Sequence, residues 1–520
     1  MNSEILRRPA SAASNEHAEA VHVELAAVQA HLDAPAADLG RLLAYILEKP
    51  LSRQQIQGLL EQSYTRLQEL RAAHHELAER LSAAGLDEVR SSAAAALSGG
   101  DDLSLPRVDQ VYEKAYRDCL ERSLPADLAA RLRAQQALAS ATMLDLRHAA
   151  ALYAEAAATA GIETDAHIQY LNRQAAVLED LGREFLDIEA LQAATALYEN
   201  VILARISRQQ QPELWAQTQN RLGNALGILG QRHRGTHILE LAIAAFERAL
   251  DEFDREQNSA DWAAAQNNLG NALGILGQRH KDPEMLDAAL AAFARALEVR
   301  SQESCAEEWA TTQNNLAAVL LSLGQQRKDA KMLKRAVESY RAVLGVWIRE
   351  RMPFTWATTM NNLGTALRML GEQRKGPRTL EQAVAAYNAA LSVRTRERVP
   401  NDWAMTQNNL GAALQVLGER TEDVLLLGKS IAAYTQALKE WTREAQPMSW
   451  AMTMANLGVA RRKYAEGSAD IDIARRATVD LKMAVDVFRG ASHAHLTELG
   501  EEQLSLARKL LGTLTAASQQ

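Results

Sequence analysis

Apolar side chains recur at spacings of three and four residues along most of the chain, which is the spacing of one face of an α-helix. Between residues 215 and 490 the pattern itself returns every 47 residues, and each copy begins with a tryptophan: Trp215, Trp262, Trp309, Trp356, Trp403 and Trp450. Later in most copies a small residue is followed by an aromatic four positions on and another small residue three further on, as at Ala289, Phe293 and Ala296. Each copy therefore predicts two helices joined by a turn.

The sequence around Trp262 also carries signals for where these helices begin and end. Asp261 is an N-cap candidate for the first helix, and Gly277 is suited to a left-handed cap at its C-terminus. Asp282, followed by a proline, is the N-cap candidate of the second helix. An arginine such as Arg255 is predicted near the end of the preceding second helix, where positive charge suits the helix dipole.

At these positions the sequence resembles the tetratricopeptide repeat family, whose pattern is a Leu-Gly pair, a large residue three on, and then Ala, an aromatic and Ala. One copy supplies these residues as Leu269, Gly270, Leu273, Ala289, Phe293 and Ala296. The family's standard repeat has 34 residues, and its usual tryptophan position is held here by Gln266, so the chain is similar to the extended variants of kinesin light chains and bacterial signalling proteins. The resemblance implies an all-α, right-handed α-solenoid whose first helices line a concave groove that binds a peptide or protein.

The same patterns divide the chain into five regions. Residues 1–35, rich in alanine and serine, predict a flexible N-terminus. Residues 36–125 predict an N-terminal helical region, residues 126–214 two degenerate copies of the repeat, and residues 215–490 six regular copies. Residues 491–520 carry leucines at helical spacing and predict a C-terminal capping helix, which covers the exposed end of the array.

A heptad pattern runs through residues 56–81 of the N-terminal helical region. Most of its eight positions are apolar: Ile56, Leu60, Ser63, Leu67, Leu70, His74, Leu77 and Leu81. This pattern is consistent with a coiled coil between two copies of the chain. It is also typical of one helix of a hairpin that packs on the solenoid, and the sequence alone leaves both interpretations open.

Two adjacent columns of asparagine stand at the centre of the first helices. Asparagine inside a helix costs about 0.5–0.7 kcal/mol relative to alanine, so these residues need an offsetting role. For the second column, which includes Asn268 and Asn409, we predict that each amide bonds to a backbone group of the adjacent helix and so sets the register between copies. The resemblance makes the first column the better candidate for gripping a peptide backbone, because an amide both donates and accepts: Asn220, Asn267, Asn314, Asn361 and Asn408.

The resemblance places further candidate residues on the concave surface. These are predicted to contact the bound segment: Asn271, Thr311, Thr358, Arg368 and Arg462. The columns change from small and polar in the early copies to apolar and basic in the late ones. Arg368 and Arg462 are suited to an acidic group on the partner.

Composition narrows the function without naming a partner. A formal net charge of -8 argues against a general nucleic-acid binder, which normally carries a basic stripe. Two cysteines far apart predict neither a disulfide framework nor a metal site, and no motif for a catalytic nucleophile is found. A signal peptide and an apolar run of membrane-spanning length are also lacking, so a cytoplasmic location is expected.

These observations predict a non-enzymatic scaffold for protein–protein interactions that uses no cofactor and no metal. Its partner is expected to be a peptide or protein segment in the concave groove, and the chain is suited to be the regulatory or sensing partner of a separate effector. The alternative is a structural protein that forms homo-oligomers through its N-terminal helices.

Overall fold

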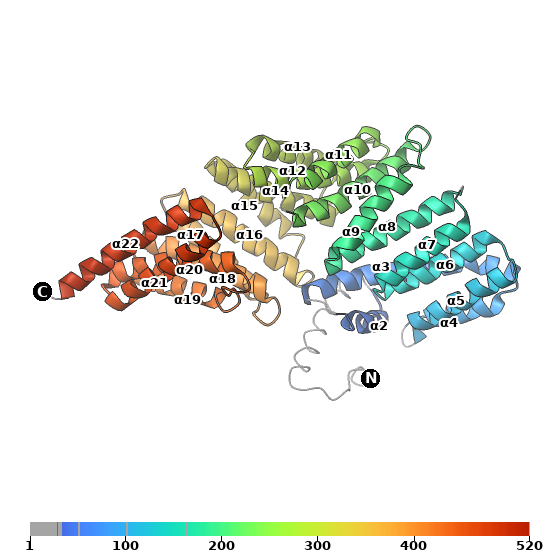
Figure 1. Ribbon diagram of the computed structural model, residues 1–520, viewed down its shortest axis with the longest axis horizontal. Coiled ribbons are helices and arrows are strands. Elements are labelled where there is room, and N and C mark those ends of the chain that lie inside the picture. The colour runs from blue at the N-terminus through green and yellow to red at the C-terminus, as the bar shows by residue number, and fades with distance from the viewer. Residues whose placement is uncertain are drawn as a thin grey trace, which may run out of the picture. The chain divides into compact units, whose positions relative to one another are not determined.

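The computed structural model of the chain describes residue 29 and residues 34–49, 53–99, 102–162, 164–233 and 235–518. The N-terminus predicted to be flexible, residues 1–35, lies outside these residues except for positions 29, 34 and 35. Every regular element in the described part of the chain is a helix. The chain divides into two compact units, residues 1–301 and residues 302–520, called here the N-terminal unit and the C-terminal unit. Each unit is an all-α stack of antiparallel helix pairs (Figure 1).

The N-terminal unit contains the helices α2 to α13. A group of four precedes the repeats: α2 (Ala36–Leu47), α3 (Arg53–Ala83), α4 (Asp87–Leu97) and α5 (Leu105–Glu121). Two pairs lie in the region predicted as degenerate copies: α6 (Ala126–Thr142) with α7 (Leu146–Ala160), and α8 (Asp165–Phe185) with α9 (Ile188–Ala196), which continues as the π-helix η2 (Leu197–Ile202). Two regular pairs follow: α10 (Pro212–Arg232) with α11 (His237–Glu252), and α12 (Ser259–His280) with α13 (Pro283–Val299).

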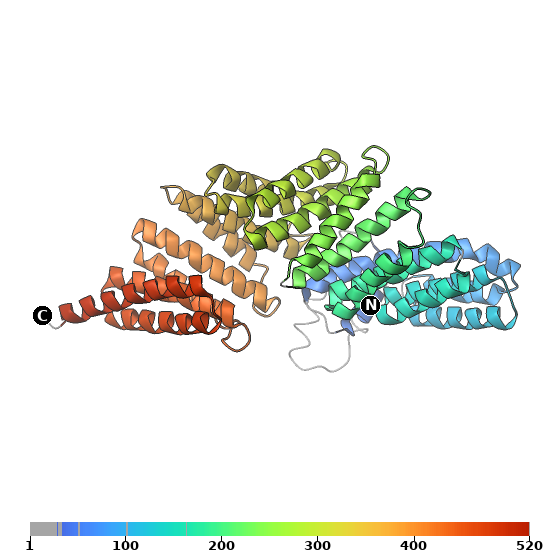
Figure 2. The same ribbon diagram turned by 45° about the horizontal axis from the view of Figure 1, so that its top comes forward.

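The C-terminal unit contains four regular pairs and one terminal helix. The pairs are α14 (Ala306–Gln326) with α15 (Ala330–Val343), α16 (Pro353–Glu372) with α17 (Arg378–Leu391), α18 (Pro400–Thr421) with α19 (Val424–Ala437), and α20 (Pro447–Ser468) with α21 (Ile471–Gly490). The terminal helix α22 (Ala494–Ser518) packs on α21 and α20 (Figure 2). The division between the two units falls between the second and third regular pairs.

Glycines bring the two helices of a pair into close contact. A Cβ atom added at Gly270 of α12 would lie 2.8 Å from the ring of Phe293 on α13, which is too close for any side chain. A Cβ atom at Gly277 would meet Leu286 at 3.0 Å. The prediction that Gly277 caps α12 is therefore wrong: the helix continues to His280, and Lys281 takes the left-handed conformation with a φ of 54°.

The helix starts confirm one prediction and correct another. The Asp282 side chain caps α13 by accepting hydrogen bonds from the backbone N–H groups of Glu284 (2.9 Å) and Met285 (3.3 Å). The first helices instead begin three residues before their tryptophans, as at Ser259 for Trp262, so the predicted N-cap Asp261 lies inside the first turn. Proline occupies this starting position in four first helices, where its missing N–H group costs nothing: Pro212, Pro353, Pro400 and Pro447.

The arginines predicted to close the second helices lie beyond the helix ends. Helix α11 ends at Glu252, and the guanidinium carbon of Arg255 lies 5.6 Å from the ring centroid of Trp262. The same guanidinium pairs with Glu298 at 2.7 Å. Four of these arginines, Arg208, Arg255, Arg349 and Arg443, therefore lie over tryptophan rings in cation–π contacts rather than compensating a helix dipole.

The heptad positions of residues 56–81 are buried inside the N-terminal unit. All eight lie on α3 and are less than a tenth exposed, and the apolar ones belong to a core shared with α2, α4, α5 and α6. His74 is satisfied there, because Nδ1 lies 2.9 Å from the Tyr112 hydroxyl and Nε2 lies 3.1 Å from the carbonyl of Arg90. The hypothesis of a coiled coil between two copies is therefore wrong for this segment: its apolar face already packs within the chain.

In the described part of the chain, no helix has both the length and the apolar character needed to cross a membrane.

Candidate ligand-binding surface

The first helices of successive pairs lie next to one another in the N-terminal unit. Helix α10 contacts α8 on one side and α12 on the other, so equivalent side chains of the three helices form rows. Two neighbouring hollows lie on the face that these helices share. This face, called here the first-helix face, contains the predicted residues Asn220 and Asn271.

The first hollow is polar and has a volume of about 410 Å³. Its wall combines carboxylates, guanidinium groups and amides: Glu179, Asp180, Arg183, Gln217, Asn220, Arg221, Asn224 and Asp261. Arg221 is exposed and forms no ion pair within 4 Å with any described residue. The hollow therefore offers a charged guanidinium and several amide groups to a ligand.

The second hollow, of about 230 Å³, shares Glu179, Arg183 and Asn224 with the first and continues along α10 and α12. Its polar groups lie beside apolar ones: Asn268, Asn271, Gly227, Ile228, Ile275 and Phe246. A Cβ atom added at Gly227 would meet nothing within 4 Å, so the absence of a side chain there contributes to the hollow. Backbone amides and apolar side chains of a peptide would both find complementary groups on this surface.

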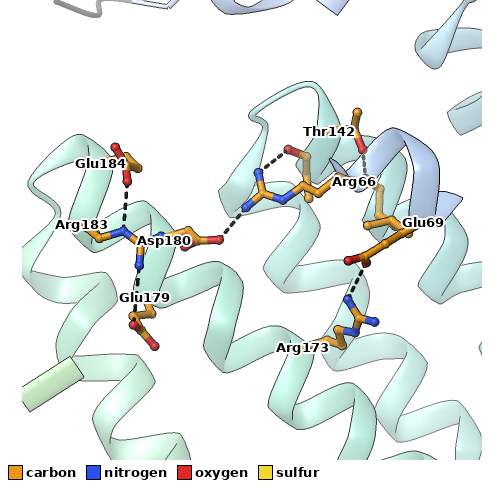
Figure 3. Close-up of polar contacts among 10 residues, drawn as sticks. Arg66, Glu69, Thr142, Arg173, Glu179, Asp180, Arg183 and Glu184 are labelled. Atoms are coloured by element: carbon orange, nitrogen blue, oxygen red, sulfur yellow. Dashed lines mark hydrogen bonds and ion pairs between the residues drawn. The ribbon is translucent and has the colours of Figure 1, made fainter. Parts of the chain in front are cut away.

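A network of ion pairs fixes the α8 side of the hollows (Figure 3). Arg183 pairs with Asp180, with Glu184 at 3.0 Å and with Glu179 at 3.8 Å. Asp180 also accepts a hydrogen bond of 2.5 Å from Arg66 of α3, which donates a second one to the carbonyl of Ala141 at 3.1 Å. The N-terminal helices thus hold α8 in place at the first hollow.

Glu179 is the least solvated charge of this network. Its side chain is 11% exposed, and its nearest ion-pair partner lies 3.8 Å away. Burial is the main cause that raises the pKa of its carboxyl group to about 7, and Arg183 opposes this shift. Arg221 also acts on this buried group and on the nearby Tyr198: its positive charge lowers the pKa of both, against the larger opposite effect of burial.

We expect Glu179→Gln to stabilise the N-terminal unit at pH 8 and to have little effect at pH 4. The raised pKa means that the folded state holds the Glu179 proton more tightly than the unfolded state, so its contribution to stability is lost as the pH rises from about 4.5 to about 7. The neutral amide avoids this loss, which is on the order of 1–3 kcal/mol. Denaturant unfolding of both proteins at the two pH values measures the difference, and an equal effect at both would contradict the assignment.

The two asparagine columns bond to each other across successive repeats. In the N-terminal unit, Asn268 Nδ2 lies 3.5 Å from Asn220 Oδ1 of the first column, and it donates at 2.9 Å to Asn224 Oδ1, which belongs to neither column. In the C-terminal unit, Asn409 Nδ2 donates to Asn361 Oδ1 at 3.1 Å and Asn456 Nδ2 to Asn408 Oδ1 at 3.4 Å. The second column thus joins neighbouring repeats as predicted, but its bonding partners are side-chain amides rather than the predicted backbone groups.

The first column supplies the other half of these register bonds. Asn361 and Asn267 are buried, and each donates from Nδ2 to the next residue along the chain, at 3.3 Å to Asn362 and at 3.2 Å to Asn268. The other three members, Asn220, Asn314 and Asn408, are half-buried. The division into a binding column and a structural column therefore does not match the contacts, because both columns hold neighbouring repeats together.

The remaining predicted residues differ in how accessible they are. Asn271 lines the second hollow. Thr311 is exposed and donates to the Glu307 carbonyl of its own helix at 2.9 Å. The Thr358 hydroxyl accepts a hydrogen bond of 2.7 Å from the buried Arg394. Arg368 pairs with Glu372, four residues further along α16.

Arg462 lies under the terminal helix. Its side chain is 12% exposed, and its Nη2 atom donates to the side chain of Gln503 on α22 at 3.3 Å. It also lies 3.7 Å from Glu466. An acidic partner could therefore reach Arg462 only by displacing contacts that the chain already makes.

Glu179, Asp180 and Arg183 could not be identified from the 47-residue pattern, because they lie before the regular copies. The sequence does contain a weak signal, because Gly182 precedes Leu191 by nine residues, just as Gly230 precedes Leu239. In the structure, a Cβ atom added at either glycine would lie within 3 Å of that leucine. This alignment puts Glu179 in the same column as Gly227. In the described residues, no group of three or more His, Cys, Asp or Glu side chains is placed to hold a metal ion.

Comparison with protein families gives a match in the C-terminal unit. Residues 309–349 and 403–440 match the family described as "Tetratricopeptide repeat". No curated protein matches the chain.

Several solved structures are distantly similar. BtubC (BKLC) from P. vanneervenii is 20% identical over 49% of this chain and 92% of its own, with a TM-score of 0.36. The Rap protein in complex with Competence and Sporulation Factor is 12% identical over 75% of this chain and 100% of its own, with a TM-score of 0.38. Human IFIT1, solved as a dimer with PPP-AAAA, is 14% identical over 93% of this chain and 95% of its own, with a TM-score of 0.41.

Proposed function

Since this chain is a tetratricopeptide-repeat protein, we propose that it is a non-enzymatic scaffold that binds a peptide or protein segment on its first-helix face. Repeats of this family support a role in protein interaction. The binding site proposed here consists of the two adjoining hollows over α8, α10 and α12. A separate effector regulated by this binding fits the proposal, with the chain as its sensing or regulatory partner.

The observation that carries this proposal is that polar groups line the hollows and keep bonding capacity that the fold does not use. The side chain of Asn271 has no hydrogen bond to a described residue, the exposed Arg221 guanidinium forms no ion pair within 4 Å, and Gly227 leaves open space on the same face of α10. The second helices instead meet the first through apolar contacts such as Phe246 and Phe293 against glycine. A peptide with alternating N–H and C=O groups could pair with the amide and guanidinium groups at little cost to the fold.

The hydrogen-bonded asparagines of the first helices, called here the asparagine ladder (Asn220, Asn224 and Asn268 in the N-terminal unit), support the same surface indirectly. Its amide–amide bonds hold equivalent first helices in register, which keeps the hollows open and aligned. Changing the ladder residues would alter the register and the surface together. Variants that test binding should therefore leave Asn220, Asn224 and Asn268 intact.

The direct test is to fill the second hollow and measure partner capture. We expect the double variant Gly227→Met/Asn271→Met to lose the proteins that the wild-type chain captures from a lysate of its source cells, because two added side chains occupy the space left for the ligand. The matched control is Glu247→Met/Ala291→Met, which adds the same side chains to exposed positions of the second helices α11 and α13. Quantitative mass spectrometry of the captured proteins compares the three forms.

Helicity and thermal unfolding of the variants separate a binding effect from a folding effect. Capture lost in the hollow-filling variant and kept in the control, at equal helicity, is the expected result. Equal capture by all three well-folded proteins would contradict the proposal.

The alternative of a homo-oligomer assembled through the N-terminal helices is not proposed, because the heptad residues of α3 are buried in the core of their own unit.

A further inference from the structure

Helix α22 continues the repeat register by one further first helix. Three of the buried residues of α20, Thr453, Leu457 and Ala460, have counterparts 47 positions later in Gly500, Leu504 and Ala507. These three are the buried residues of α22. The terminal helix therefore occupies the place of a first helix, and no second helix follows it among the described residues.

The face on which a second helix would pack is polar, as a capping helix requires. Gly458 and Arg461 of α20 contact α21, and their counterparts on α22 are Ser505 and Arg508. Both of these are exposed. The capping role is thus fulfilled by this polar face and by the buried residues on the opposite side.

Capping does not explain a second apolar stripe on α22. Leu499 is 45% exposed and Leu506 is 41% exposed, although most leucines of the unit are buried. Leu510 and Leu514 are partly exposed and extend the stripe, because spacings of seven and four keep residues on one helical face. The apolar arc of α22 is therefore wider than the part that packs on its own unit.

Two opposite charges lie along one side of the stripe, a negative one nearer the start of α22 and a positive one nearer its end. Glu502 and Lys509 are seven residues apart, so they lie on the same flank. Both are exposed, and neither forms an ion pair with a described residue. In an antiparallel pair of such helices, Glu502 of each copy would lie beside Lys509 of the other.

The spacing of the leucines fits the same antiparallel arrangement. When Glu502 and Lys509 are placed opposite each other, a rise of about 1.5 Å per residue puts Leu499 of one copy between Leu510 and Leu514 of the other, about 3 Å from each along the axis. The two Leu506 side chains then meet at the centre. One stripe thus provides both interdigitating leucines and complementary charges.

We propose that the exposed stripe of α22 is a self-association surface, on which a second copy of this chain packs its own α22 in the antiparallel direction. The surface buries the exposed leucines of both copies, and the two Glu502–Lys509 pairs fix the direction of packing. It adds an assembly state to the scaffold and does not depend on the ligand-binding hollows of the N-terminal unit.

Sedimentation velocity of the full chain over a range of concentrations tests this proposal. The wild-type mass is expected to approach twice that of the monomer as the concentration rises, and Leu499→Gln/Leu506→Gln is expected to stay monomeric. Both positions are exposed, so the fold should survive, which circular dichroism checks. The matched control is Leu425→Gln on α19, a leucine that is 77% exposed in the same unit, and it should associate like the wild type.

The charges give a second test of the antiparallel direction. Glu502→Lys alone and Lys509→Glu alone each place like charges together and should weaken self-association several-fold. A mixture of the two single variants should restore it, because each pair then again joins opposite charges. A wild-type chain that stays monomeric at all concentrations would overturn the proposal, as would a mixture that associates no better than its components.

One outcome separates this proposal from a ligand on the same helix. If the wild type is monomeric but Leu499→Gln/Leu506→Gln loses captured proteins, the stripe belongs to a ligand-binding face and the self-association surface is wrong.

Discussion

Replacing Gly223 by alanine is expected to destabilise the α10–α11 pair, whereas the same change at Gly227, one turn later in the same helix, is expected to stabilise it. A Cβ atom at Gly223 would lie 2.6–2.9 Å from three atoms of the Phe246 ring, which is inside van der Waals contact. Overpacking of this kind costs about 1–3 kcal/mol. At Gly227 nothing lies within 4 Å, and alanine gains about 0.5–1 kcal/mol of helix propensity.

Hydrogen exchange of the amides of α10 and α11 measures this pair of variants locally. A local probe is preferable because stability in a repeat array is a sum of nearest-neighbour terms, so a global midpoint mixes several units. The two glycines lie on the same helix and differ mainly in what surrounds them. Equal protection in the two variants would mean that the glycine–aromatic contact does not hold the pair together.

In the C-terminal unit, removing the charge partner of Arg394 is expected to cause a large loss of folding stability. Arg394 follows α17 and is only 2% exposed, with Asp402 at 3.5 Å and the hydroxyls of Thr358 and Thr406 at 2.7 and 3.0 Å. Burial is the main cause that lowers the pKa of this guanidinium. Asp402→Ala would leave a buried cation without a counter-charge, which costs about 3 kcal/mol.

Replacing Arg394 itself by phenylalanine is expected to cost no more than about 1 kcal/mol, because a well-packed apolar residue can replace a buried ion pair with little loss. The repeat register supports this choice: Phe253 and Phe488 stand at the equivalent position of other copies, and both are buried. The threonine hydroxyls keep their bonds to the carbonyls of Phe354 and Asp402. Denaturant unfolding compares the two variants, and a larger loss for Arg394→Phe than for Asp402→Ala would contradict this account of the buried charge.

The helix pairs and their buried faces could be predicted from sequence because apolar spacing depends only on helical geometry. Ala289, Phe293 and Ala296 are fully buried, as their spacing requires. The residues at which the helices end were harder to predict, because a glycine can either cap a helix or allow a second helix to pack close to it. Gly277 does the second, and only the position of Leu286 decides between them.

The candidate site was predicted in part for a related reason. Residues at equivalent positions of successive repeats form a row in space, so Asn271 could be placed on the first-helix face. The columns do not reveal which amides bond to each other across repeats, because Asn268 reaches Asn224 and Asn220 of the preceding copy only through the stacking of α10 and α12. Glu179 was missed because α8 lies outside the 47-residue register.

The most direct test of the central claim, that the first helices form the binding surface, is hydrogen–deuterium exchange of the full chain with and without its captured partner. The claim predicts slower exchange in α8, α10 and α12 when the partner is present. Protection confined to the second helices α11 and α13 would contradict it.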